Sequence, residues 1–156
     1  MPSHHDARHK KKSFLHRHSL SIVSIALVLL WIVLYARGNE HTHWGAFFGN
    51  AIADWTGVVV TVLGTKWFYE KGSAESRQPK GEPKNHALRL LRDHSLILFL
   101  VVTGVGWVAY YLAVGPETKW GSVVGNIVSE WTQIIGLVLL TKRLVEQYSK
   151  ESGGRS

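Results

Sequence analysis

Four stretches of this chain carry almost no charge, and each is about 20 residues long, which is enough to cross a bilayer as a helix. Positions 18–36 and 94–116 contain no Asp, Glu, Lys or Arg, positions 41–65 contain only Asp54, and positions 120–141 contain only Glu130. A soluble domain of 156 residues has no core large enough to bury four such helices. The sequence therefore predicts an all-α integral membrane protein, a four-helix bundle.

Basic side chains are distributed very unevenly among the segments that join these stretches. Sixteen of the 18 Lys and Arg residues lie in the N-terminal tail, between the second and third stretches, or after the fourth; only Arg37 and Lys119 lie in the other two loops. By the positive-inside rule, this asymmetry predicts that both termini and the central segment are cytoplasmic. We expect a multi-pass protein of the cell (plasma) membrane, whose partner is the lipid bilayer and which binds no nucleic acid.

The two halves of the chain resemble each other when the sequence is shifted so that His18 falls on His94. Twenty identities then occur over positions 18–76, and they include Trp, His, Asn, Lys and Glu residues that shared apolar composition does not explain. Further examples are Asn50 with Asn126, Lys66 with Lys142, and Glu70 with Glu146. The pattern predicts two parallel-repeat transmembrane hairpins, related by an axis along the membrane normal.

This duplication divides the chain into five expected segments. They are a disordered basic cytoplasmic tail (1–17), a first hairpin (18–71), a cytoplasmic linker (72–87), a second hairpin (88–148) and a cytoplasmic tail (149–156). Positions 86–92 are expected to form an amphipathic, basic lead-in to the third spanning helix.

The second helix of each copy opens with the pattern Trp-Gly-x3-Gly-Asn-x3-acid-Trp-Thr. Its glycines, Gly45 and Gly49 in one copy and Gly121 and Gly125 in the other, are four positions apart and so share a helix face. This small-x3-small spacing predicts close approach of transmembrane helix backbones.

The acid of this pattern, Asp54 or Glu130, lies near the expected bilayer midplane, where a carboxylate is costly. The predicted intramembrane polar site consists of Asp54, Glu130, Asn50, Asn126, Gln133, Thr56 and Thr132. Three interpretations remain open. The site binds a proton, a cation or a polar headgroup, with the two acids sharing a proton across the axis; the polar groups only fix helix packing; or the acids lie in a water-filled outer vestibule.

Other chemistry has little support in the sequence. His41 and His43, beside Glu40, are weak candidates for zinc or copper ligands, but the second copy has Glu117 and Lys119 at the two histidine positions, so we predict no metal. Cysteine is absent, and no phosphate-binding loop, catalytic triad or dinucleotide motif is present. We therefore expect no cofactor and no enzymatic activity.

Several motifs resemble those of a family of small, duplicated-hairpin bacterial membrane proteins known only as a domain of unknown function. The resemblance rests on the run from Gly72 to Arg77, on His94-Ser95-Leu96, and on Asn126, Ser129-Glu130-Trp131, Gln133 and Leu140-Thr141. The first copy follows the family pattern less fully, with Asp54 in place of Glu and Gly57 in place of Gln, and the outer loops are short. The resemblance implies a bacterial membrane protein in which the acid positions matter, and it implies no substrate.

Two functions fit these features. The first is translocation or sensing of an ion, a proton or a small solute through Asp54 and Glu130. The alternative is a non-catalytic membrane scaffold or accessory subunit, with a lipid-modifying enzyme as a third option. Four helices are few for a complete transport pathway, so a homodimer or a larger membrane complex is expected.

Overall fold

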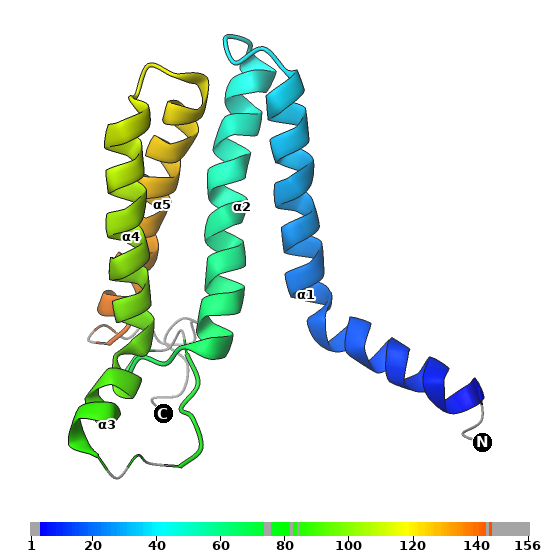
Figure 1. The fold of residues 1–156 in the computed structure, drawn as a ribbon, viewed down its shortest axis with the longest axis vertical. Coiled ribbons are helices and arrows are strands. Elements are labelled where there is room, and N and C mark those ends of the chain that lie inside the picture. Colours follow the sequence, from blue (N-terminus) through cyan, green and yellow to red (C-terminus); the bar gives the residue numbers. More distant parts are fainter. Residues whose placement is uncertain (1–3, 74–75, 82, 84, 143, 145–156) are drawn as a thin grey trace.

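The computed structural model describes residues 4–73, 76–81, 83, 85–142 and 144. Over these residues the chain is all-α, with no strand, and its elements are α1 (His4–Arg37), α2 (His43–Trp67), α3 (His86–Asp93), α4 (Ser95–Val114) and α5 (Lys119–Leu140) (Figure 1). Four of the helical segments are long and apolar enough to cross a membrane: His18–Arg37 within α1, and α2, α4 and α5. The predicted all-α fold with four such helices is confirmed.

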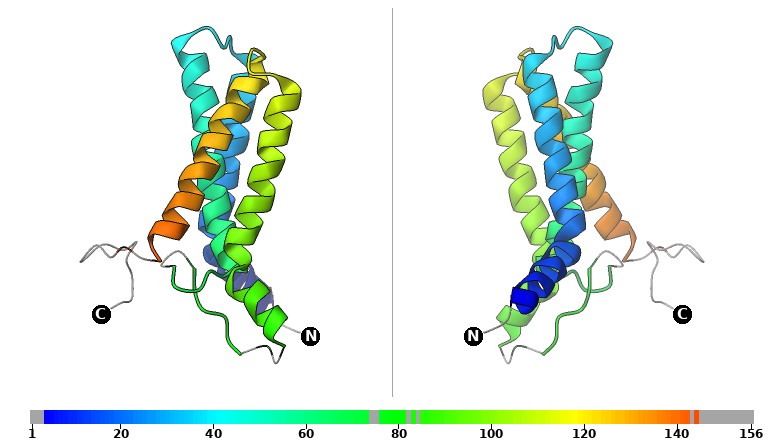
Figure 2. Two further views of the ribbon diagram at one scale, coloured as in Figure 1. Left: turned by 90° about the vertical axis from the view of Figure 1, so that its left-hand side faces the viewer. Right: turned by 90° about the vertical axis from the view of Figure 1, so that its right-hand side faces the viewer.

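The four long helices form two antiparallel hairpins. Helix α1 packs against α2, α4 packs against α5, and the hairpins meet through α2 and α5. The turns that close the two hairpins lie at the same end of the molecule, which we call the turn end (Figures 1 and 2). Helix α3 and the described residues of the segment that connects it to α2 (68–73, 76–81, 83 and 85) lie at the opposite end, the connector end.

The two hairpin turns are built in the same way. Thr42 caps α2 by accepting a hydrogen bond from the Gly45 amide (3.0 Å), and Thr118 caps α5 by accepting one from the Gly121 amide (2.9 Å). A Cβ atom at Gly45 would overlap the carbonyl of Asn39, and one at Gly121 would overlap that of Gly115. Both turns therefore require glycine, because the backbone of the turn lies directly against the first turn of the helix that follows.

The N-terminal segment differs from the expectation of a disordered tail. Helix α1 begins at His4, well before the apolar stretch, and this basic part bends away from the bundle in Figure 1. Residues 4–17 contain neither Gly nor Pro, and a helix that is already nucleated extends easily through such a sequence. The second tail, expected at 149–156, lies outside the described residues.

The connection between the hairpins contains a further helix. The sequence predicts that positions 86–92 lead directly into the third spanning helix, but α3 ends at Asp93 and α4 begins separately at Ser95.

Packing between the hairpins leaves much of the apolar surface uncovered. One buried cluster contains Tyr35, Ile52, Ala53, Val123, Ile127 and Trp131, and a second contains Leu96, Leu100 and Val138. Large apolar side chains on the outward faces remain exposed, among them Leu20 (63%), Val102 (69%) and Leu112 (76%). Such a surface is unfavourable in water, and the four long helices are consistent with a multi-pass membrane protein.

Candidate functional site

The polar residues singled out from the sequence lie along α2 and α5, where the two hairpins meet. The amide of Asn126 donates a hydrogen bond to Oδ1 of Asn50 across this interface, at 2.6 Å. These two asparagines align with each other when the sequence is shifted so that His18 falls on His94, so the bond joins corresponding points of the two hairpins. It is the central polar contact between the hairpins.

The two acids lie one helical turn beyond this asparagine pair. The carboxylate of Glu130 lies over Gly57 of α2, so close that a Cβ atom at Gly57 would be 3.2 Å from Oε2. Glu130 also accepts a hydrogen bond from the Gln133 amide (3.2 Å). Asp54 is exposed, and its carboxylate forms no hydrogen bond or ion pair with any residue that the structure describes. One interpretation of the sequence is that Asp54 and Glu130 share a proton. The structure has no hydrogen bond between these two carboxylates.

The two threonines of the predicted site make equivalent contacts with their own helices. Thr56 donates to the carbonyl of Ile52 (2.6 Å), and Thr132 donates to that of Val128 (3.0 Å). Each hydroxyl proton is therefore used within its helix, and the oxygen remains free only to accept a bond.

A hollow of about 360 Å³ lies between the two hairpin turns and reaches the asparagine pair. Asn50 and Asn126 are among its lining residues, together with Tyr35, Glu40, His41, Glu117 and Lys119, whereas Asp54 and Glu130 are not. The hollow therefore reaches the level just above the acids from the turn end. An outer vestibule of this kind includes the asparagines and does not extend to the acids.

Lys119 ties together the walls of this hollow. Its ammonium group donates to the Gly38 carbonyl (2.7 Å) and pairs with Glu40 (3.6 Å), and its own carbonyl accepts a bond from the Tyr35 hydroxyl (2.7 Å). A hydrogen bond with the backbone, and then the charge of Lys119, hold the pKa of Glu40 below its usual range. The hollow is thus bounded by a carboxylate that stays ionised and by a lysine from the other hairpin.

The four predicted packing glycines lie at close contacts, but their partners are not other helix backbones. Gly45 and Gly121 lie against the hairpin turns, as described above. A Cβ atom at Gly49 would be 3.1 Å from the ring of Tyr35, and one at Gly125 would be 3.0 Å from the ring of Tyr111. Each of these two glycines makes room for a tyrosine from the preceding helix of its own hairpin.

The histidines of the first hairpin turn do not form a metal cluster. His41 lies 3.8 Å from the carboxylate of Glu40. Within the described part of the chain, no group of three or more His, Cys, Asp or Glu side chains is arranged to hold a metal ion.

A second polar cluster, which the sequence analysis missed, lies at the connector end around Glu70. Glu70 follows α2 and is completely buried (0% exposed). Its Oε1 atom lies 2.7 Å from Nδ1 of His94 and pairs with the ammonium group of Lys142, and its Oε2 atom accepts a hydrogen bond from the Ile97 amide (3.2 Å). We call Glu70, His94 and Lys142 the Glu70 cluster.

The Glu70 cluster joins three elements of the two hairpins. Helix α4 has no side-chain cap of its own at His94, and the carboxylate of Glu70 takes this role by binding an amide of its first turn. The backbone after α2 pairs with the start of α4, because Tyr69 accepts from the Leu96 amide (3.1 Å) and Lys71 donates to Asp93 (2.7 Å). Lys142 adds the end of α5 to this joint.

The sequence did contain a signal for this cluster. Glu70, His94 and Lys142 each align with an identical residue when the sequence is shifted so that His18 falls on His94, and these residues are Glu146, His18 and Lys66. In the structure Lys66 lies 3.0 Å from Nδ1 of His18, while Glu146 lies outside the described residues. The signal is weak, because a charged residue at the end of an apolar stretch is equally expected from membrane topology alone.

Comparisons of the chain with models of protein families, with curated proteins and with solved structures find no match.

Proposed function

We propose that this chain is an integral protein of the bacterial inner membrane, built from two duplicated hairpins, with both termini and the connector end in the cytoplasm. The four long apolar helices and their exposed outward faces support membrane insertion. The concentration of basic residues at the connector end and in the tails supports the orientation.

The proposed duplication is supported by contacts that recur at equivalent positions of the two hairpins. The caps at Thr42 and Thr118 recur in this way, as do the packing of Tyr35 on Gly49 and of Tyr111 on Gly125. The residues that make these contacts are identical in the two halves of the chain, so the geometry recurs together with the sequence. The motifs shared with the family of duplicated-hairpin membrane proteins point in the same direction.

We further propose that the α2–α5 interface binds a proton, a cation or a small polar solute and translocates or senses it. One observation carries this proposal. Asn50 and Asn126, which are hydrogen-bonded to each other, line a hollow at the turn end, and the carboxylates of Asp54 and Glu130 lie one helical turn further along α2 and α5. Inside a bilayer such carboxylates are costly. Asp54 is the more available of the two, because Glu130 is already hydrogen-bonded by Gln133.

The test is a flux measurement with purified protein in liposomes. Replacement of Asp54 by Asn or of Glu130 by Gln should reduce a pH- or cation-driven flux at least tenfold, because each substitution removes a charge with little change of shape. Asp93→Asn is the matched control, since it removes a carboxylate outside the α2–α5 interface and should leave the flux unchanged. Unfolding temperatures in detergent would show that all three variants are folded.

The alternative is a non-catalytic scaffold or accessory subunit, and the hydrogen bonding of the site favours it in one respect. The asparagines bond to each other and the threonines to their own helices, so most of these polar groups are satisfied without a ligand. The exposed apolar faces would then receive partner helices, in a homodimer or a larger complex. The scaffold function would be favoured if the wild-type protein produced no flux in liposomes and if Asp54→Asn and Glu130→Gln lowered only the unfolding temperature.

A further inference from the structure

We propose that a groove at the connector end binds the phosphate-containing headgroup of an anionic phospholipid. This inference rests on the proposed membrane location, and it concerns residues other than those of the α2–α5 interface.

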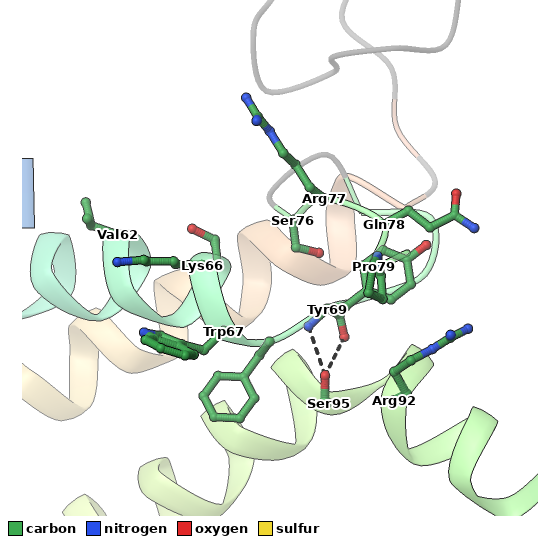
Figure 3. A pocket seen from close by; sticks show the side chains of 12 residues that line it. Val62, Lys66, Trp67, Tyr69, Ser76, Arg77, Gln78, Pro79, Arg92 and Ser95 are labelled. Carbon is green, nitrogen blue, oxygen red and sulfur yellow. Dashed lines mark hydrogen bonds between the residues drawn. The ribbon is translucent and has the colours of Figure 1, made fainter. Parts of the chain in front are cut away.

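The groove has a volume of about 630 Å³ and lies where the end of α2, the connecting segment and the start of α4 meet (Figure 3). Lys66 and Trp67 lie at one end of it in this view, Arg92 lies at the other, and Tyr69 and Ser95 lie between them. The hydroxyl of Ser95 is bonded to both the amide and the carbonyl of Tyr69 (2.9 and 3.1 Å), which fixes the floor of the groove. The groove is therefore formed by two segments that the hydrogen bonds of Ser95 hold together.

Three cationic side chains from three different elements line the groove: Lys66 from α2, Arg77 from the connecting segment and Arg92 from α3. No carboxylate is among the described residues that line it. Arg92 forms an ion pair with Asp93 (2.9 Å) and donates to the carbonyl of Gly81. This pairing holds the pKa of Asp93 below its usual range, so Asp93 offsets the charge of Arg92. Lys66 and Arg77 thus supply the net positive charge that an anion would meet.

The surroundings of the groove match the depth at which headgroups lie. Trp67 is 73% exposed, with the ammonium group of Lys66 5.5 Å from its ring centre, and such aromatic–cation pairs are typical of the membrane interface. Helix α3 lies beside the groove and outside the four-helix bundle. Its Leu88 and Leu91 side chains are exposed (56% and 57%). A basic helix with exposed leucines is the kind that lies in the plane of an interface.

These features favour a lipid over a soluble phosphate compound. A soluble anion would be bound by Lys66 and Arg77 alone, and it would leave the exposed leucines and Trp67 in water. A phospholipid places its phosphate at the cations and its acyl chains against the apolar side chains, which include Val62 and Phe68 of the lining. Each cation near an anionic lipid surface contributes about 1 kcal/mol, or about fivefold in affinity.

The experiment uses the full-length protein in phosphatidylcholine nanodiscs that contain some brominated phosphatidylglycerol or, for comparison, some brominated phosphatidylcholine. Bromine quenches nearby tryptophans, and the difference between the wild type and a Trp67→Phe variant isolates Trp67 from the other six. Trp67 should be quenched more strongly by the anionic lipid. This preference should fall about fivefold in Lys66→Gln and in Arg77→Gln, and it should persist in Arg37→Gln, the matched control at the turn end.

The outcomes separate this proposal from the one on which it rests. If the other tryptophans are quenched by both lipids but Trp67 shows no preference, or if Arg77→Gln keeps the preference, the headgroup site is wrong and membrane insertion stands. If neither lipid quenches any tryptophan, insertion fails and this site fails with it. Loss of the preference on addition of glycerol 1-phosphate would assign the groove to a soluble anion and overturn the lipid assignment.

Discussion

A carboxylate that is wholly buried needs a partner for each of its oxygens, and Glu70 has three partners. His94 and Lys142 contact one oxygen, and the Ile97 amide contacts the other. The three partners come from α4 and from the end of α5, whereas Glu70 itself continues from α2. Through these partners, the single residue Glu70 joins the two hairpins at the connector end.

Replacement of Glu70 by Gln should destabilise the protein by about 3 kcal/mol, because it removes the charge of a fully buried carboxylate that pairs with Lys142 and accepts a hydrogen bond from the Ile97 amide. Glu40→Gln is the matched control. Glu40 also pairs with a lysine, but it lies in the exposed turn, so its loss should lower the unfolding temperature far less. Both can be measured by thermal unfolding in detergent. Equal effects of the two substitutions would show that the Glu70 cluster does not stabilise the fold.

The sequence makes Asp54 conspicuous but does not show the burial of Glu70. Asp54 is conspicuous because it interrupts an apolar stretch, yet in the structure its side chain is exposed on α2. Glu70 lies among other charged residues after the stretch has ended, yet it is buried. Burial at the end of a helix depends on how the chain folds back, here on the pairing of residues 69–71 with 93–96. Local composition carries no record of that pairing.

At the scale of elements, the glycines of α5 have contrasting surroundings. Gly121 faces the carbonyl of Gly115 in the hairpin turn, so closely that there is no space for a side chain. Gly136, in the same helix, has no atom within 4 Å of the position of an added Cβ. Only the first of these glycines is therefore required by the structure.

Gly121→Ala should destabilise the protein by about 1–3 kcal/mol, because the turn must move to admit the methyl group. Gly136→Ala should leave stability unchanged or raise it slightly, since alanine is the better helix former. The two substitutions add the same atoms to the same helix, which makes them a matched pair for thermal unfolding. A larger loss from Gly136→Ala than from Gly121→Ala would contradict the contacts assigned to these glycines.

The helices themselves were predictable from the sequence, because their formation depends mainly on long runs of apolar residues. The partners of particular side chains on those helices were not. The spacing of Gly45 and Gly49 correctly marks one face of α2, but it does not say whether a helix, a turn or a tyrosine ring will occupy that face. For Gly49 the occupant is Tyr35, which lies on the preceding helix, beyond the hairpin turn.

For the molecule as a whole, polar contacts join the hairpins at three levels. At the turn end Lys119 reaches Gly38, in the middle Asn126 reaches Asn50, and at the connector end Lys142 reaches Glu70. Each of these contacts crosses from one hairpin to the other. The two hairpins are therefore joined at several heights, although the sequence suggested only the middle one.

The proposed orientation predicts that the turn end and the connector end face opposite sides of the membrane. The chain contains no cysteine, so single cysteines can report which side of the membrane a residue faces. Gln78 in the connecting segment and Glu117 in the α4–α5 turn are both exposed and lie at opposite ends of the bundle. In spheroplasts, a membrane-impermeant maleimide should label Glu117→Cys at once and Gln78→Cys only after lysis. The reason is that the basic residues beside Gln78 hold that end in the cytoplasm. Labelling of Gln78→Cys in intact spheroplasts would reverse the orientation, and equal labelling of both before lysis would contradict membrane insertion itself.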